Sequence, residues 1–148
     1  HIGISKDYNV FELQNALGEK DVLKANRIIN YFSKNTKNHH IVPILSALFS
    51  FFQKVMMYHS IKNKSSNSAA SVLKVNPFFI NQYQIAAKHY NKKQLFFIFG
   101  HLKKYDLRSK GVDNRSTNQT HTQTSTNTFF LIIFCVGPHI SPGLAPAV

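Results

Sequence analysis

The sequence predicts an all-α fold: a helical bundle of about five helices, followed by a disordered or irregular tail. Apolar residues recur every three or four positions in successive segments, which is the spacing of amphipathic helices. Helix-capping and helix-breaking residues separate these segments. Hydrophobic residues make up 43% of the 148 positions, which is enough for one domain with a core.

The first two segments predict an antiparallel helical hairpin. An amphipathic helix is expected over residues 5–17, and Gly18 is expected to stop it. Asp21 is the expected N-cap of a second helix of about fourteen residues, and the short link between the two helices implies the hairpin. Residues 33–40 are polar and predict a loop.

A third and more hydrophobic helix is predicted from Ile41 to Tyr58, with Pro43 tolerated in its first turn. Its residues leave almost no polar face, which predicts burial on several sides. A membrane span needs roughly 20 predominantly apolar residues, and Gln53 and Lys54 interrupt this run after about twelve. A central core helix is therefore preferred over a membrane span.

Two further helices are predicted back to back between Asn76 and Gly111. The Ser/Asn-rich connector 62–71 is expected to pass into one or two helical turns before Asn76. Asn76 is the expected N-cap with Pro77 at the first helical position, and Gly111 is the expected C-cap of the second helix. The two apolar stripes are expected to pack on each other and on the helix 41–58. They consist of Phe79, Tyr83, Ala86, Ala87 and Tyr90 in the first helix, and of Leu95, Ile98, Phe99, Leu102 and Tyr105 in the second.

The chain divides into two regions by composition, a helical region up to residue 112 and a tail. Because the chain starts without Met, it is interpreted as an interior piece of a longer chain. Residues 113–148 form a separate tail. Its Ser/Thr/Asn/Gln-rich part predicts disorder, and its apolar run 129–136 is too short to span a bilayer and precedes a Pro/Gly-rich end. No function is assigned to this tail, which is interpreted as disordered or non-native.

Positive charge is concentrated in the helical region. The chain has 18 Lys and Arg against 6 Asp and Glu, and residues 1–112 hold 17 and 5 of them. Such a charge favours polyanionic partners, nucleic acid first and anionic membrane surfaces second, although solvated lysines are the commoner explanation. The candidate phosphate contacts are Lys88, Lys92, Lys93, Lys103, Lys104 and Arg108. No aromatic or glycine pattern of a nucleic-acid motif accompanies them, and Phe78, Phe79 and Tyr83 are interpreted as core residues.

Catalytic and metal-binding patterns are missing from the sequence. It contains no phosphate-binding G-x-x-x-x-G-K-[ST] loop, no G-x-S-x-G turn and no H-E-x-x-H pair. Cys135 is the single cysteine, which excludes a disulfide framework and a cysteine-based zinc site. His39 and His40 are interpreted as solvated loop residues. The sequence therefore predicts no catalytic, cofactor or metal site.

Three separated blocks, residues 4–32, 75–90 and 102–111, together resemble the C-terminal part of the delta subunit of bacterial DNA polymerase III in its Bacteroidetes-like form. The resemblance covers residues 1–112. It implies a clamp loader component, since delta subunits open the ring-shaped sliding clamp so that it can be placed on primed DNA during replication. It also implies that residues 9–112 are a collar-like oligomerisation domain, and that residues 1–8 are the end of a preceding domain or a linker. The tail departs from the ending expected of such subunits.

The resemblance also implies partners. These are other clamp loader subunits in a hetero-oligomer, the sliding clamp through an upstream domain outside this chain, and DNA through the complex. A cytoplasmic location without a membrane partner is expected. The parent holoenzyme is a DNA-directed DNA polymerase, a nucleotidyltransferase, whereas this part is expected to be non-catalytic. The matching positions are interpreted as packing and assembly residues: Asn76, Pro77, Phe78, Leu102, Tyr105, Asp106, Leu107, Lys110 and Gly111.

Two alternatives remain open at this point. One is a free-standing basic helical module that binds nucleic acid through phosphate contacts, with an affinity that falls steeply as salt rises. The other is a membrane-surface protein that uses the helix 41–58 or the apolar run 129–136.

Overall fold

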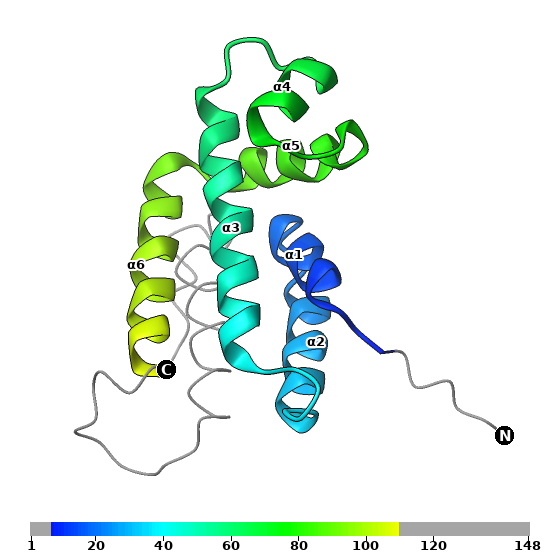
Figure 1. Cartoon of the computed structure of the whole chain (residues 1–148), viewed down its shortest axis with the longest axis vertical. Coiled ribbons are helices and arrows are strands. Elements are labelled where there is room, and N and C mark those ends of the chain that lie inside the picture. Colours follow the sequence, from blue (N-terminus) through cyan, green and yellow to red (C-terminus); the bar gives the residue numbers. More distant parts are fainter. Residues whose placement is uncertain (1–6, 110–148) are drawn as a thin grey trace, which may run out of the picture.

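The structure is a computed structural model, and it describes residues 7–109. These residues form six α-helices and one short 3-10 helix with no strand among them, which confirms the predicted all-α fold (Figure 1). The predicted tail and its boundary lie outside the described residues. In chain order the elements are α1 (Val10–Gly18), α2 (Val22–Lys34), α3 (Ile41–Ser60), α4 (Ser66–Leu73), the 3-10 helix η1 (Pro77–Phe79), α5 (Ile80–His89) and α6 (Lys92–Ser109).

Side-chain caps begin α1, α2 and η1. Asn9 and Glu12 form a capping box, which begins α1 at Val10 and not at the predicted residue 5. The Asp21 carboxylate accepts from a backbone N–H in the first turn of α2, as predicted. Asn76 caps the next element in the same way and Pro77 occupies its first position, both as predicted. This element is the 3-10 helix η1, however, and the predicted α-helix begins only at Ile80.

Gly18 does not stop α1 by its own backbone conformation, contrary to the prediction. It is the last helical residue, and the left-handed position two residues later belongs to Lys20, with φ 54°. Around Lys20 the N–H of Asp21 donates to Ala16 O over 2.8 Å and that of Lys20 to Leu17 O over 3.1 Å. This is a Schellman turn with lysine where glycine is usual.

Gly18 instead permits close packing. A Cβ atom added to it would lie 3.2 Å from Phe51 Cζ in α3 and 3.3 Å from the Ala86 Cβ in α5. Both neighbours are fully buried. The glycine therefore lets α1 approach α3 and α5 at the same point.

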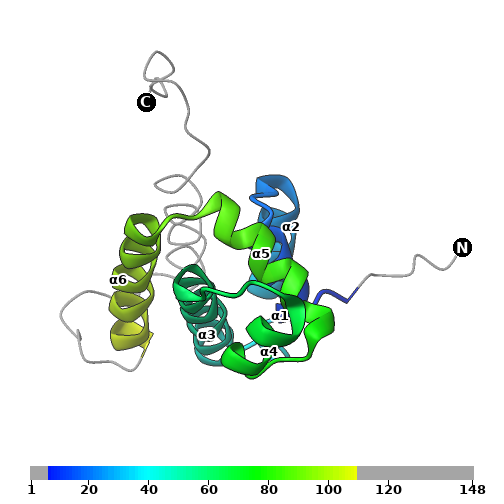
Figure 2. The same ribbon diagram turned by 90° about the horizontal axis from the view of Figure 1, so that it is seen from above.

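Helix α3 is the centre of the fold (Figures 1 and 2). Helix α6 runs beside it, whereas α1 and α5 pack against it elsewhere and α4 contacts it as well. The main packing partner of α6 is α3 and not α5, so the expected stacking of the two C-terminal stripes on each other is wrong. The short bend between α5 and α6 carries the chain away from α5 and along α3.

By length and composition alone, α3 could cross a membrane. No other helix among residues 7–109 is long and apolar enough to do so. Its surroundings are those of a core helix: α1, α4, α5 and α6 all pack on it. The central position predicted for this helix is therefore confirmed. Its buried residues are Ile44, Leu45, Leu48, Phe51, Phe52, Val55 and Tyr58.

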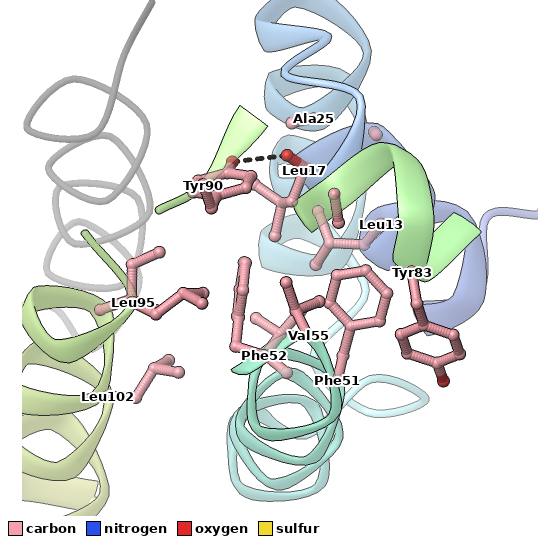
Figure 3. Packing of buried hydrophobic residues seen from close by; sticks show 14 of the residues in the cluster. Leu13, Leu17, Ala25, Phe51, Phe52, Val55, Tyr83, Tyr90, Leu95 and Leu102 are labelled. Carbon is pink, nitrogen blue, oxygen red and sulfur yellow. Dashed lines mark hydrogen bonds between the residues drawn. The ribbon is translucent and has the colours of Figure 1, made fainter. Parts of the chain in front are cut away.

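The core is layered around the aromatic pair of α3 (Figure 3). The Phe51 ring lies 5.3 Å from the ring of Tyr83, and the Phe52 ring lies 5.4 Å from that of Tyr90, both measured between centroids. Leu95 and Leu102 point from α6 toward α3 on the other side. Burying a large apolar side chain of this kind contributes about 1.5–3 kcal/mol. Because α3 packs on α5 and on α6 with different residues, it joins two packing layers into one core.

Two local expectations are corrected. The connector predicted over residues 62–71 ends sooner, because α4 begins at Ser66 and buries Ala69, Ala70 and Leu73. His39 is not simply solvated: its ring stacks on Phe32 with 4.5 Å between centroids. The imidazole thereby covers the end of the core below the α2–α3 loop.

Candidate interaction surfaces

The junction between α1 and the end of α5 fixes the position of the surfaces described below. The Tyr90 hydroxyl donates to Leu17 O over 2.5 Å, and His89 Nδ1–H donates to Gly18 O over 2.8 Å. From α3, His59 Nε2–H donates to Tyr90 O over 2.7 Å. Carbonyls at the C-terminus of a helix have no partner within the helix, so the two histidines satisfy Gly18 O and Tyr90 O. Leu17 O gains the Tyr90 hydroxyl as a second donor beside the Lys20 N–H. The junction ties α1, α3 and α5 together where α6 begins.

Burial shapes the electrostatics of this junction. It raises the pKa of the Tyr90 hydroxyl, which therefore remains a hydrogen-bond donor well into the alkaline range. The Lys20 ammonium lies 4.8 Å from the centre of the Tyr90 ring, within reach of a cation–π contact. Partial burial lowers the pKa of Lys20. Lys20, whose backbone is in the left-handed conformation, is thus held against the junction by its own side chain.

A first exposed surface, the aromatic knob, consists of Phe78 and Phe79. Phe78 is 84% exposed and its ring meets the edge of the Phe79 ring at 5.5 Å between centroids. The interpretation of Phe78 and Phe79 as core residues is therefore wrong, whereas Tyr83 is buried as expected. Proline and the Asn76 cap fix the backbone below these rings, so the knob is a rigid apolar projection.

A second surface, the α6 outer face, lies opposite the stripe of α6 that packs on α3. Phe96 is 68% and Phe97 58% exposed, although their neighbours Leu95 and Ile98 are fully buried. Gly100 lies between the aromatic pair and the next turn, and a Cβ added there would meet nothing within 4 Å. At 100° per residue, the exposed positions share one side of the helix. They are Lys93, Phe96, Phe97, Gly100, Lys103, Lys104 and Leu107, and Lys92 in the first turn is exposed at the edge of this side.

Charge is sharply segregated along the chain. Residues 22–105 contain 13 Lys and Arg and no Asp or Glu. The acidic residues of the described part are Asp7, Glu12, Glu19 and Asp21 around α1, and Asp106 near the end of α6. The α6 outer face therefore lies in a long cationic stretch with few carboxylates to neutralise it.

The structure places the candidate residues of the sequence in different environments. Lys88 is exposed on α5, and Lys92, Lys93, Lys103 and Lys104 are exposed on α6. Leu102 is buried against α3, and Leu107 is partly exposed. Tyr105, Asp106 and Arg108 belong to α6, but their side chains are outside the described set, as are Lys110 and Gly111 altogether.

Phe96 and Phe97 were missed as surface residues by reasoning from the sequence. A signal was present: they fall between Leu95 and Ile98, off the three-four spacing of the buried stripe. Large aromatic residues at such positions are expected on the solvent side of a helix.

Among residues 7–109, no three His, Cys, Asp or Glu side chains gather closely enough to hold a metal ion. What this part of the chain presents is a rigid knob and a basic aromatic helix face. Fold and surfaces together define a class, the small, basic, all-α domains with exposed aromatic side chains.

Comparison with known proteins gives the family. The model of the family described as "DNA polymerase III delta subunit, C-terminal domain" matches residues 7–121, and the chain belongs to this family. The resemblance found in the sequence is thereby confirmed at the level of the family. No curated protein and no solved structure matches the chain.

Proposed function

We propose that this chain acts in assembly of a clamp loader, the complex that loads the sliding clamp on DNA during replication, and that its helical domain binds sibling subunits. Support comes from the family match over residues 7–121. The domain is a non-catalytic part of that complex, located in the cytoplasm. Its partners are other clamp loader subunits, with the sliding clamp bound through an upstream domain.

The aromatic knob is the surface that best fits subunit binding. An aromatic side chain that is 84% exposed gains much apolar burial when a partner covers it, and aromatic residues are enriched at the centres of protein interfaces. The rigid turn of Asn76 and Pro77 lowers the entropy lost on docking. Phe78 is therefore the anchor, with Phe79 beside it.

The mechanism is mechanical. The knob sits on η1, which packs on α4 and α5, and α4 and α5 both pack on α3. A subunit bound at the knob is thus connected to the central helix through packed side chains rather than through a loop. This arrangement would hold the ATP-driven modules of the complex in register.

The test is a pull-down of the full 148-residue chain with reconstituted clamp loader subunits of a related bacterium, at 50 mM and 500 mM NaCl. Binding through an apolar knob persists at both salt concentrations. Phe78→Ala is expected to weaken it by about 30-fold or more, the effect of a typical interface anchor. The matched control is Phe11→Ala, which removes a similarly exposed ring from α1. Equal binding by wild type and both variants would contradict the role of the knob, and no retention of subunits at all would contradict the assembly function.

A further inference from the structure

The α6 outer face has a composition that subunit packing does not require. Three lysines, Lys93, Lys103 and Lys104, surround the exposed rings of Phe96 and Phe97. An interface core is normally depleted of lysine, because burying an ammonium without a partner is costly. The combination of aromatic rings and lysines on one strip suits a different kind of partner.

We propose that the α6 outer face binds single-stranded nucleic acid, with the lysines at the phosphates and the two phenylalanine rings stacked on unpaired bases. Such sites combine a cationic track for the backbone with aromatic side chains for the bases, and they tolerate any sequence. From Lys93 to Lys104 the lysines span about 16 Å along the helix axis, at 1.5 Å per residue, with the rings between them. The site thus has charge at both ends and stacking in the middle.

Duplex nucleic acid fits this face less well. Its bases are already stacked on each other, so the two rings would gain no base contact and would be left against the backbone. Only a strand with unpaired bases uses both the rings and the lysines. The proposal is therefore for single strands.

Two features make the face accessible and complementary to a polyanion. Gly100 leaves open space at the middle of the strip, where a backbone or base can approach closely. In addition, residues 22–105 contain no Asp or Glu, and this part of the sequence includes α3 and most of α6. The net positive charge of these residues favours a polyanionic partner.

The experiment measures fluorescence anisotropy of a labelled 20-nucleotide oligothymidine with the full 148-residue chain, between 25 and 200 mM NaCl. With three phosphate contacts, the logarithm of the binding constant falls with the logarithm of salt at a slope of about −2. The double variant Lys103→Gln/Lys104→Gln is expected to reduce that slope to about −0.7. The control Lys34→Gln/Lys37→Gln removes the same charge from the end of α2 and its loop and leaves the slope unchanged.

Stacking is tested separately. Phe96→Ala and Phe97→Ala are each expected to weaken oligothymidine binding about fivefold or more, whereas Phe78→Ala leaves it unchanged. Four outcomes overturn the proposal: equal loss in both lysine double variants, no effect of Phe96→Ala and Phe97→Ala, duplex binding as tight as single-strand binding, or displacement of the oligonucleotide by anionic phosphatidylserine vesicles. Because the knob variant is the control here and the test variant for subunit binding, either proposal can fail alone.

Discussion

Two glycines at helical positions have opposite roles. At Gly18 the space that a side chain would occupy is already taken by Phe51 and Ala86, whereas Gly100 faces open space. A glycine inside a helix costs about 0.5–1 kcal/mol relative to alanine. Its retention is explained by packing at Gly18, and at Gly100 nothing within residues 7–109 explains it.

Gly100→Ala is therefore expected to raise the free energy of unfolding by about 0.5–1 kcal/mol. Gly18→Ala is expected to lower it by about 1 kcal/mol, because the buried Phe51 and Ala86 have little room to move and overpacking outweighs the gain in helix propensity. Urea-induced unfolding followed by circular dichroism measures both changes. If both substitutions changed the free energy of unfolding in the same direction, the assignment of a packing role to Gly18 alone would be wrong.

At the scale of the residue, caps were predictable from sequence and conformational exceptions were not. Asp21 and Asn76 cap their helices as predicted, because capping depends on one side chain and the backbone next to it. Lys20 in the left-handed region was not foreseen, since glycine is the usual residue there. Its stabilising contact, the Tyr90 ring, comes from a residue far along the chain.

At the scale of the element, the contact of α1 with the end of α5 depends on Tyr90. Its hydroxyl is a buried donor to Leu17 O, and burial raises its pKa above the ordinary value of 10.0. Above about pH 10 the tyrosine of the unfolded chain loses its proton while the folded protein keeps it. The free energy of unfolding therefore has its full tyrosine contribution below pH 10 and falls as the pH rises beyond it.

Tyr90→Phe is expected to lower the free energy of unfolding by about 1 kcal/mol at pH 7.5, the value of a typical buried hydrogen bond. The variant lacks the ionisable group, so its stability falls less steeply than that of the wild type between pH 9.5 and pH 11. The difference between the two proteins consequently shrinks with rising pH. Urea unfolding curves across this range measure it, and parallel pH dependences would contradict the buried neutral tyrosine.

The helices themselves were mostly predictable, but their partners were not. Apolar spacing identifies which side of a helix is buried, and it correctly selected Leu95, Ile98 and Leu102 in α6. It contains no information on which neighbour covers that side, so the predicted α5–α6 packing was wrong. Helix α4 was underestimated because its Ser/Asn-rich beginning has the composition of a loop.

At the scale of the whole molecule, the charge distribution affects stability as well as binding. Residues 22–105 hold 13 positive side chains and no carboxylate, so folding brings like charges closer together. Salt shortens the screening length from about 30 Å at 0.01 M to about 8 Å at 0.15 M. The charge sign was predictable from composition, whereas the gathering of the exposed rings and lysines on α6 required the structure.

The protein is accordingly expected to become more stable as NaCl rises from 10 to 150 mM, by roughly 1 kcal/mol in the free energy of unfolding. Urea unfolding at each salt concentration measures the change. The variant Lys104→Glu places a carboxylate in the cationic stretch, so its free energy of unfolding should depend less on salt than that of the wild type. A fall in wild-type stability with added NaCl would indicate that attractive ion pairs dominate instead.

The junction at Tyr90 also determines how the domain would respond to tension. The chain enters through α1, whose C-terminal carbonyls are bound by residues 89 and 90, and it leaves through α6, which begins two positions later. A pull between the two ends of the domain therefore runs from α1 across these bonds into α6. Helices α2 to α4 lie outside that load path. They would remain folded under low force, and rupture of the junction would expose the whole span between Gly18 and His89, 71 positions apart in the sequence, to the full pull at once.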